Sequence, residues 1–385
     1  MNGELVFKSA RLVLGGEVVQ GTLAVAGGSI VALDSGGTGV PEAADLEGDY
    51  LLPGLVELHT DNFERHLMPR PKVRWATLPA LLAHDAEVAA SGITTVFDSL
   101  GVGDTDEDAL RAQGWGEVID AIGRATQDGL LRAEHLLHVR CELAAPNTVE
   151  LFEPFVGDSR VGLISLMDHT PGQRQWENIE QARVYYTGKK GWSNEKFDRQ
   201  VVDAKAVQER YALPHRRHFV EYAKRHGIVL ASHDDTRREH VLEAHAEGAT
   251  ISEFPTSILA ATVACEKGMS VVMGAPNVVR GGSHSGNVSA LDLARQGLLH
   301  TLSSDYVPIS LLMAAFRLVD EAGWSIPQAV ASVSRNPAAS LGLKDRGEIA
   351  PGKRADLVQV RLVEGLEGRK QPVVRAVWRE GRRIV

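Results

Sequence analysis

Histidine and acidic residues recur where short apolar segments of this chain end. The clearest case is GLVELHTDNFERHLMPRP (54–71), in which an apolar run leads directly into His59 and Asp61. A two-residue spacing places two side chains on the same side of a strand, so this imidazole and this carboxylate could bind one divalent cation. Alone, His-x-Asp is a weak signal, because a capping Asp beside a hydrogen-bonded His gives the same pattern.

Six of the seven further apolar segments end in the same kind of residue, and the remaining one ends in an asparagine. Their terminal side chains are Asp98, Glu142, Asp168 with His169, His233 with Asp234 and Asp235, Glu253, Asn277, and Asp305. If the segments are parallel strands of one barrel, their carboxyl ends meet at one rim, where catalytic side chains collect. Charged groups that converge there need a cation or one another, because unpaired charges are costly to bury.

This convergence predicts a divalent metal site with Asp305 as the catalytic acid–base residue. The predicted ligands are His59, Asp61, Glu142, His233 and Asp305, with His169 and Glu253 as further candidates that could equally contact the substrate. A bound cation lowers the pKa of a water molecule, and Asp305 could then take the proton of that water.

Several of these residues also have a purely structural alternative. Glu142 could be a surface residue or a salt-bridged one, and Asp234 or Asp235 could cap the following helix while His233 points inward. Asp305 could cap the helix that is expected after Pro308.

The elements that would position these residues form a repeating pattern. Segments rich in β-branched and apolar residues occur eight times, with helical patterns and glycine stops between them. The strand segments are 51–61, 92–100, 136–143, 161–169, 227–235, 249–257, 270–277 and 298–306, and helical segments include 78–91, 215–227, 236–248 and 309–323. Eight such units predict an α/β fold of the (β/α)8 type, a TIM barrel.

The two ends of the chain follow a different pattern. Residues 1–50 and 345–385 alternate short β-like runs with Gly-rich turns, and neither end alone offers many strands. We therefore predict that both ends join into one small β-sandwich domain beside a metal-dependent barrel that spans 51–344. Residues 172–214 are long for a connection and are expected to form an inserted, partly helical lid after the fourth strand.

Composition narrows the possible environments and partners. The chain has 385 residues and a net charge of -9, which argues against sequence-independent binding to nucleic acid. No segment is long and apolar enough to span a membrane, and the first residues do not resemble a secretory leader, so a cytoplasmic location is expected. Cys141 and Cys265 are expected to be unpaired thiols. The sequence leaves homo-oligomerisation open.

Basic residues are concentrated in loops that are expected to share the rim. Arg65, Arg70, Lys72 and Arg74 follow the first strand, Arg174, Lys189 and Lys190 lie in the insertion, and Arg237 and Arg238 follow the fifth strand. Each alone could be a solvated surface cation. Together they indicate a polyanionic ligand.

The segment RGGSHSGN (280–287) adds a guanidinium, hydroxyl groups and unobstructed backbone NH groups after the seventh strand. This composition suits phosphate binding, and loops after strands seven and eight often bind phosphate in barrels. A plain flexible loop is the alternative. The predicted substrate contacts are Arg65, Arg70, Lys190, Asn277, Arg280, Ser283 and His284.

The order of these motifs resembles the amidohydrolase superfamily. The resemblance rests on PGLVELHTD (53–61), a Glu on the third strand, His233, Asp305 and the segment GEIAPGKRADLVQV (347–360). Within the superfamily, ELHTDNFERHLMPRP, ASHDD, EFPTS and APNVVRGGSHSGN resemble the PhnM family, the ribose 1-methylphosphonate 5-triphosphate diphosphatases of the carbon–phosphorus lyase pathway. Asp61 and Glu253 stand where many other amidohydrolases have histidine, which leaves open whether one or two metal ions are bound.

The resemblance implies a fold and a reaction. The implied fold is an amidohydrolase barrel flanked by a β-sandwich, and the implied reaction removes pyrophosphate from a small-molecule ribose triphosphate phosphonate in phosphonate catabolism. The implied cofactor is a divalent metal, with Zn2+ as the first choice and Mn2+, Ni2+ or Mg2+ as alternatives. Two other functions stay open: hydrolysis of a C–N bond by a deacetylase, cyclic amidase or deaminase, and a non-catalytic scaffold. The cationic rim disfavours the first, and the complete ligand set disfavours the second.

Overall fold

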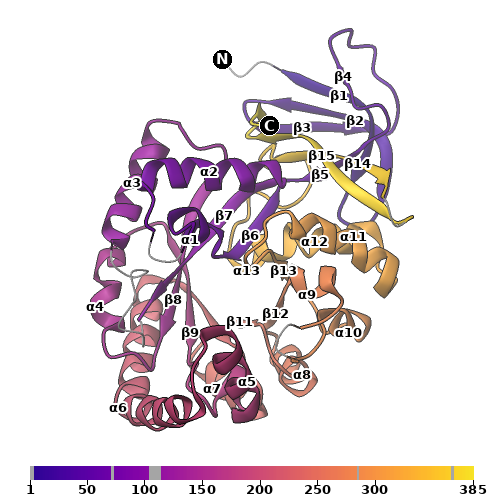
Figure 1. Cartoon of the computed structure of the whole chain (residues 1–385). Helices are drawn as coiled ribbons and strands as arrows, with labels where there is room; N and C mark the ends of the chain where they lie inside the picture. Colours follow the sequence, from indigo (N-terminus) through magenta and orange to yellow (C-terminus); the bar gives the residue numbers. More distant parts are fainter. Residues whose placement is uncertain (1–3, 71–72, 104–113, 284–285, 366–367) are drawn as a thin grey trace.

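The computed structural model describes residues 4–70, 73–103, 114–283, 286–365 and 368–385, except for the side chains of Lys189 and Lys190. Its larger part is a barrel of eight parallel strands, each paired with the next along the chain (Figure 1). The strands are β6 (Leu55–Thr60), β7 (Ile93–Val102), β8 (Glu134–Glu142), β9 (Val161–Met167), β10 (Val229–His233), β11 (Ile251–Glu253), β12 (Ser270–Gly274) and β13 (Thr301–Ser303). The predicted (β/α)8 fold is confirmed.

The barrel interior is filled by apolar side chains from six different strands. This cluster consists of Leu58, Phe97, Leu163, Ala231, Ile251 and Val272, all of which are buried. Inward-facing side chains of this kind make a barrel of eight strands a packed core rather than a pore. The interior is therefore closed below the rim, and only the rim is available for a ligand.

A backbone bridge and the side chain of Glu57 together close the barrel between its first and last strands. Only one isolated bridge, Thr60 to Asp305, joins β6 and β13 within the described residues. The carboxylate of Glu57 completes the closure, because it accepts hydrogen bonds from the Ser303 hydroxyl at 2.9 Å and the backbone NH of Ser304 at 2.5 Å. Burial raises the pKa of Glu57 to about 7. Glu57 is therefore a structural acid in the first strand.

Helices cover the outside of the barrel. They are α1 (Asn62–Leu67), α2 (Thr77–Ala90), α3 (Trp115–Gln127), α4 (Thr148–Phe152), α5 (Ile179–Lys190), α6 (Asn194–His226), α7 (Arg238–Ala246), α8 (Ile258–Glu266), α9 (Ala275–Arg280), α10 (Ala290–Arg295), α11 (Ser310–Ala322), α12 (Ile326–Ala331) and α13 (Arg335–Ser340), with short 3-10 turns η1 (Glu153–Phe155) and η2 (Arg174–Trp176). None of the helices in the described part of the chain combines the length and apolar character needed to cross a bilayer.

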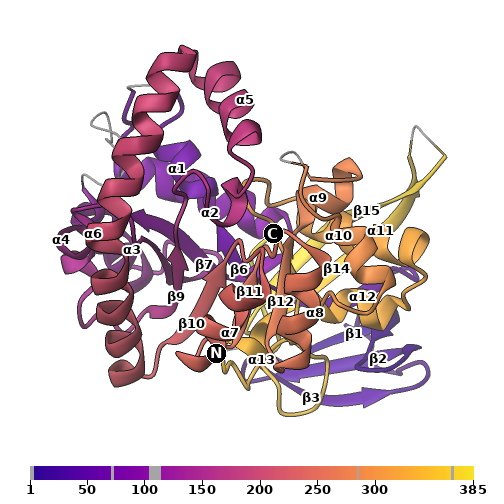
Figure 2. The same cartoon turned by 90° about the horizontal axis from the view of Figure 1, so that it is seen from below.

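The insertion after β9 forms a helical hairpin that stands out from the barrel (Figure 2). Its two helices, α5 and α6, pack on one another around Trp176, Ala182 and Phe197. The sequence predicts a separate helix over 215–227, but α6 runs on through Pro214 as one helix of 33 residues. Phe197 is buried in the hairpin and Phe219 against the barrel, so each half of α6 has its own packing partner across the proline.

Both ends of the chain contribute to one further sheet. Its strands follow the order β16-β15-β14-β5-β1-β2-β3, and β4 pairs with β1. They are β1 (Leu5–Val13), β2 (Val18–Ala26), β3 (Ser29–Asp34), β4 (Ala44–Asp45), β5 (Tyr50–Pro53), β14 (Leu357–Glu364), β15 (Lys370–Arg379) and β16 (Arg382–Arg383). The predicted joining of the two ends is thus observed, while the boundaries 1–50, 51–344 and 345–385 remain a prediction.

A glycine forms the first of the two chain connections between this sheet and the barrel. The predicted first strand, 51–61, is in fact two strands: β5 belongs to the end sheet, β6 belongs to the barrel, and Gly54 lies between them. The two cysteines are unpaired, Cys141 buried and Cys265 half-buried.

Candidate active site

A polar cavity lies at the carboxyl ends of the barrel strands. Its empty volume is about 850 Å³ including the open mouth, and its walls include His59, Arg140, His169, His233, Asp234 and Asp305. Three predicted histidines and one predicted acid therefore come together at the rim from different strands.

Three side chains at the cavity lie close together, with their ligand atoms farther apart than in a normal hydrogen bond. Oδ2 of Asp234 lies 3.6 Å from Nε2 of His169 and 3.4 Å from Nε2 of His233. Together these atoms form a group that could hold a metal ion. Two imidazoles and one carboxylate are a common donor set for a catalytic divalent metal such as Zn2+.

Glu253 connects two of the predicted ligands. Its Oε1 lies 2.6 Å from Nδ1 of His59, and its Oε2 lies 2.7 Å from Nδ1 of His233. Burial opposes a charge at this position, but the close contacts with His59 and His233 outweigh it and hold the pKa of Glu253 well below its usual value. The carboxylate thus fixes both rings through Nδ1 and leaves Nε2 of each ring for another partner.

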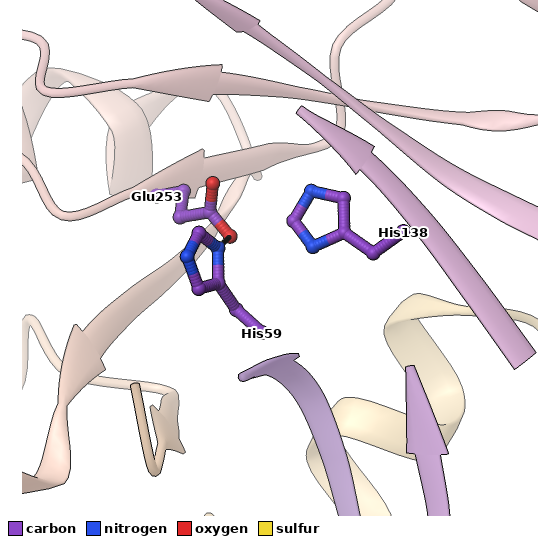
Figure 3. Close-up of side chains that lie close together, drawn as sticks. All are labelled: His59, His138 and Glu253. Atoms are coloured by element: carbon purple, nitrogen blue, oxygen red, sulfur yellow. Dashed lines mark hydrogen bonds and ion pairs between the residues drawn. The ribbon is translucent and has the colours of Figure 1, made fainter. Parts of the chain in front are cut away.

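His138, which lies beside this pair, belongs to the same buried group. His59, His138 and Glu253 project toward one another from β6, β8 and β11 (Figure 3). Nδ1 of His138 lies 2.9 Å from the carbonyl oxygen of Leu58, and Nε2 lies 2.5 Å from the hydroxyl of Ser165. Burial lowers the pKa of His138 to about 3, so this ring is neutral. Because both of its ring nitrogens are hydrogen-bonded, His138 has a structural role beside His59 and Glu253.

Glu142 contacts His169 directly. Oε2 of Glu142 lies 2.5 Å from Nδ1 of His169. Burial disfavours a charged imidazole, but Glu142 and Asp234 outweigh this effect and raise the pKa of His169 to about 10. The charged ring balances two buried carboxylates, a role that a metal ion would take over. Glu142 is therefore not a surface residue, because its side chain is only 12% exposed, but it is ion-paired, as the structural alternative allows.

Asp305 is a carboxylic acid with an unusual pKa. Burial, followed by the nearby charge of Asp61, raises the pKa of Asp305 to about 7. A group with such a pKa can accept and return a proton near neutral pH. Asp305 caps no helix, because α11 begins only at Ser310 with Ile309 as its N-cap.

The backbone is strained around the cavity. Four non-glycine residues near it have positive φ angles: Arg174 at 43°, Asp234 at 56°, Phe254 at 52° and Asp305 at 55°. Such conformations cost roughly 1–3 kcal/mol each and persist where the surrounding structure enforces them, often at functional sites. At Asp234 the expected helix-capping role is absent, since α7 begins at Arg238 with Arg237 as its N-cap.

Asp61 lies at the edge of this arrangement. Its carboxylate is 32% exposed and approaches Nη1 of Arg140 at 3.9 Å. It is not part of the groups of possible metal ligands found among the described residues. Its role as a ligand therefore stays a prediction.

Two residues that the sequence pattern places at strand ends do not end a strand in the structure. The pattern places Asp98 at the rim, but β7 continues to Val102, and Asp98 hydrogen-bonds to His84 of α2 at 2.7 Å. Asp98 thus faces the helical layer rather than the cavity. Asn277 lines the cavity but lies within α9, where its amide binds the backbone of Val288 and Ala290.

The structure brings some of the predicted phosphate-binding residues to the cavity and places others away from it. Arg280 and Ser283 line the cavity, whereas Arg65 forms an ion pair with Glu87 at 2.9 Å on α2. Arg70 forms a local bridge with Val73 and does not line the cavity. His284 and the side chain of Lys190 lie outside the described residues. The substrate contacts remain predictions.

Three residues of the site are absent from the predicted set. His138 and Arg140 alternate with Glu142 along β8, and Asp234 follows His233 directly. The sequence contains a signal for His138 and Arg140, because positions 138, 140 and 142 face the same side of a strand.

Comparison with known proteins places the chain in a family. Residues 217–385 match the family described as "Amidohydrolase family". The chain is 46% identical over 384 residues to "Alpha-D-ribose 1-methylphosphonate 5-triphosphate diphosphatase" of Escherichia coli (strain K12), with 99% of this chain and 100% of the relative covered. The chain belongs to the PhnM family of amidohydrolases.

Solved structures place the PhnM fold among other amidohydrolases. N-acetylglucosamine-6-phosphate deacetylase from Pasteurella multocida has a TM-score of 0.64 at 12% identity, with 99% of each chain covered. 5-Methylcytosine deaminase from Klebsiella pneumoniae has a TM-score of 0.63 at 15% identity, with 100% of this chain and 98% of the other covered. These likenesses confirm the predicted architecture.

Proposed function

We propose that this protein hydrolyses α-D-ribose 1-methylphosphonate 5-triphosphate to the 5-phosphate and pyrophosphate, as a metal-dependent enzyme of phosphonate catabolism. The observation that carries the proposal is the identity of 46% over nearly the whole chain to an enzyme of that name. The acids and histidines predicted from the sequence support it, because most of them meet at one cavity.

The residues at the cavity fit a divalent metal. Ligand atoms of His169 and His233 lie 3.4–3.6 Å from a carboxylate oxygen of Asp234, and His59 keeps Nε2 free while Nδ1 contacts Glu253. We assign metal binding to these residues, with Glu142 and Asp305 adjoining and with Asp61 and Glu253 retained as predicted ligands. When bound, a divalent metal such as Zn2+ supplies a Lewis acid that lowers the pKa of water and withdraws charge from a phosphoryl oxygen.

Individual residues of the chain have separate roles in the proposed reaction. Asp305 accepts the proton of the attacking water, for which its pKa near neutrality is suited. Glu253 holds the rings of His59 and His233 in one orientation. At the cavity wall, Arg280 balances the growing charge of the departing pyrophosphate, and Ser283 can donate a hydrogen bond to it. Attack at the α-phosphorus gives the two proposed products directly.

The test follows the products by phosphorus NMR in water enriched in oxygen-18. The expected result is pyrophosphate as the released product, with the heavy oxygen in the ribose 5-phosphate group. Release of orthophosphate, or heavy oxygen in the pyrophosphate, contradicts attack at the α-phosphorus. Metal content is measured on the same preparation. A lack of turnover with Zn2+, Mn2+, Ni2+ and Mg2+ in turn would contradict the proposed activity.

The remaining expectations belong with this proposal. The partner is a small-molecule substrate, the location is the cytoplasm, and homo-oligomerisation stays open. Zn2+ is the first choice of metal, and one or two ions are compatible with the residues at the cavity.

A further inference from the structure

Arg140 is a cation at the cavity that lacks a hydrogen-bond acceptor. It lies on β8, lines the cavity with His59 and Asp305, and its side chain is only 17% exposed. Among the residues that the structure describes, none accepts a hydrogen bond from its guanidinium, and its Nε is buried without a partner. A buried donor without an acceptor is costly, so this guanidinium is expected to have a ligand.

The acidic residues nearby do not fill this role. Nη1 of Arg140 lies 3.9 Å from Asp61, and Nη2 lies 3.7 Å from Glu64. Both distances exceed those of hydrogen bonds, whereas charge-assisted pairs of arginine and an oxyanion are normally 2.7–2.9 Å long. The two carboxylates therefore balance the charge of Arg140 but leave its hydrogen-bonding capacity free. A planar fork of NH groups suits two oxygens of one phosphoryl group.

Depth in the cavity distinguishes Arg140 from the other arginine in its wall. Arg280 is exposed at the end of α9 and adjoins the loop that contains Ser283. Arg140 lies deeper, on the strand that also carries His138 and Glu142, and its charge acts on Asp305. A phosphorus atom that is attacked beside Asp305 must lie close to Arg140, while a departing group can extend toward Arg280 and the mouth.

We propose that Arg140 binds the non-bridging oxygens of the α-phosphoryl group, the group that stays on the sugar. The assignment rests on the proposed function. It makes Arg140 a binding residue for both the substrate and the 5-phosphate product, and Arg280 a contact for the leaving pyrophosphate only. During attack, the fork also stabilises the charge that develops on the α-phosphoryl oxygens.

The decisive variant is Arg140→Lys, which keeps the positive charge but loses the fork. The probe is ribose 5-phosphate, titrated calorimetrically into the metal-loaded enzyme. We expect its affinity to fall about tenfold or more, since a bidentate pair becomes a point-charge contact. Arg317→Lys is the matched control, because Arg317 is 24% exposed and pairs with Glu321 on α11. The affinity of Arg317→Lys for ribose 5-phosphate should equal that of the wild type.

An unchanged affinity of Arg140→Lys would overturn the assignment, because it would show that only charge balance matters. Failure of the proposed function is distinguishable, since wild-type protein would then fail to release pyrophosphate from the triphosphate. In Arg140→Ala, added guanidinium ions should restore part of the lost affinity for ribose 5-phosphate. Restoration by sodium chloride at equal ionic strength would also contradict the role of the fork.

Discussion

Asp305 combines a half-buried position, a strained backbone and a pKa of about 7. We predict that Asp305→Asn lowers turnover by a factor of roughly 10²–10⁴, because an amide cannot accept the proton of the attacking water. Pyrophosphate release measures the effect, and circular dichroism with thermal melting checks the fold. Asp120→Asn, on the exposed face of α3, serves as the control. A variant with the wild-type rate would remove Asp305 from the mechanism.

The sequence alone predicted much of this site at the level of residues. The strand-end rule identified His59, Glu142, His169, His233 and Asp305, all of which lie at or next to the cavity. It missed His138 and Arg140, because they come before the strand end rather than at it. It also could not separate a ligand from a carboxylate that orients ligands, which depends on distances such as those around Glu253.

At the scale of elements, a buried charged network joins α2 to β7 and β8. Nδ1 of His135 lies 2.8 Å from Asp98, its Nε2 lies 3.3 Å from Asp85, and Asp98 also contacts His84. Arg132 pairs with Asp85 from the edge of the network at 3.0 Å. Burial disfavours a charged His135, but Asp98 and Asp85 outweigh it and raise the pKa of His135 to about 9. The protonated ring therefore stabilises the contact between the helix and the strands.

This shift predicts a loss of stability in mild alkali. A folded-state pKa raised from 6.5 to about 9 stabilises the protein fully below pH 6.5, and this contribution disappears as the pH rises through 9. We expect the free energy of unfolding to fall by about 3 kcal/mol from this source, since one pKa unit corresponds to about 1.4 kcal/mol. Urea denaturation at a series of pH values measures the fall.

The matched variants for this prediction are His135→Asn and His245→Asn. His135→Asn should be less stable at pH 6 and should lose this part of the pH dependence. His245 is exposed on α7, and its replacement should leave the wild-type profile intact. An identical slope in wild type and His135→Asn would contradict the assigned pKa.

Element boundaries were the least predictable part of the fold. Pro53-Gly54 interrupts the segment 51–61, but this break does not show that β5 and β6 belong to different sheets, because pairing partners are distant in sequence. The proline at 214 suggested a helix boundary, yet packing on both sides of it keeps α6 continuous. The repeated pattern of strands and helices was sufficient for the barrel itself, since each unit carries its own local signal.

At the scale of the whole molecule, Gly54 is the joint between the end sheet and the barrel. A Cβ atom at this position would lie 2.2 Å from Oγ1 of Thr94 and 2.8 Å from Cβ of Asp356. We predict that Gly54→Ala destabilises the protein by about 1–3 kcal/mol through overpacking, as measured by thermal and urea unfolding. Gly16→Ala is the control, because no atom lies within 4 Å of its added Cβ.

A second substitution identifies the cause of that loss. Replacing Thr94 by Ala together with Gly54→Ala removes the nearest clashing atoms, and part of the stability should return. A double variant no more stable than Gly54→Ala would show that the neighbouring hydroxyl is not responsible.

The pairing of β5 with β14 has a consequence for biosynthesis. A ribosome makes β1 to β5 first. The strand β14, which pairs with one edge of β5, emerges only when almost the whole chain has been translated. The barrel has the same dependence, because β6 meets β13 only near the end of translation. In each sheet one early strand, β5 or β6, therefore waits for a late partner along one edge. Until then its edge is exposed to other nascent chains, and chaperone binding during synthesis should be concentrated on these two early segments.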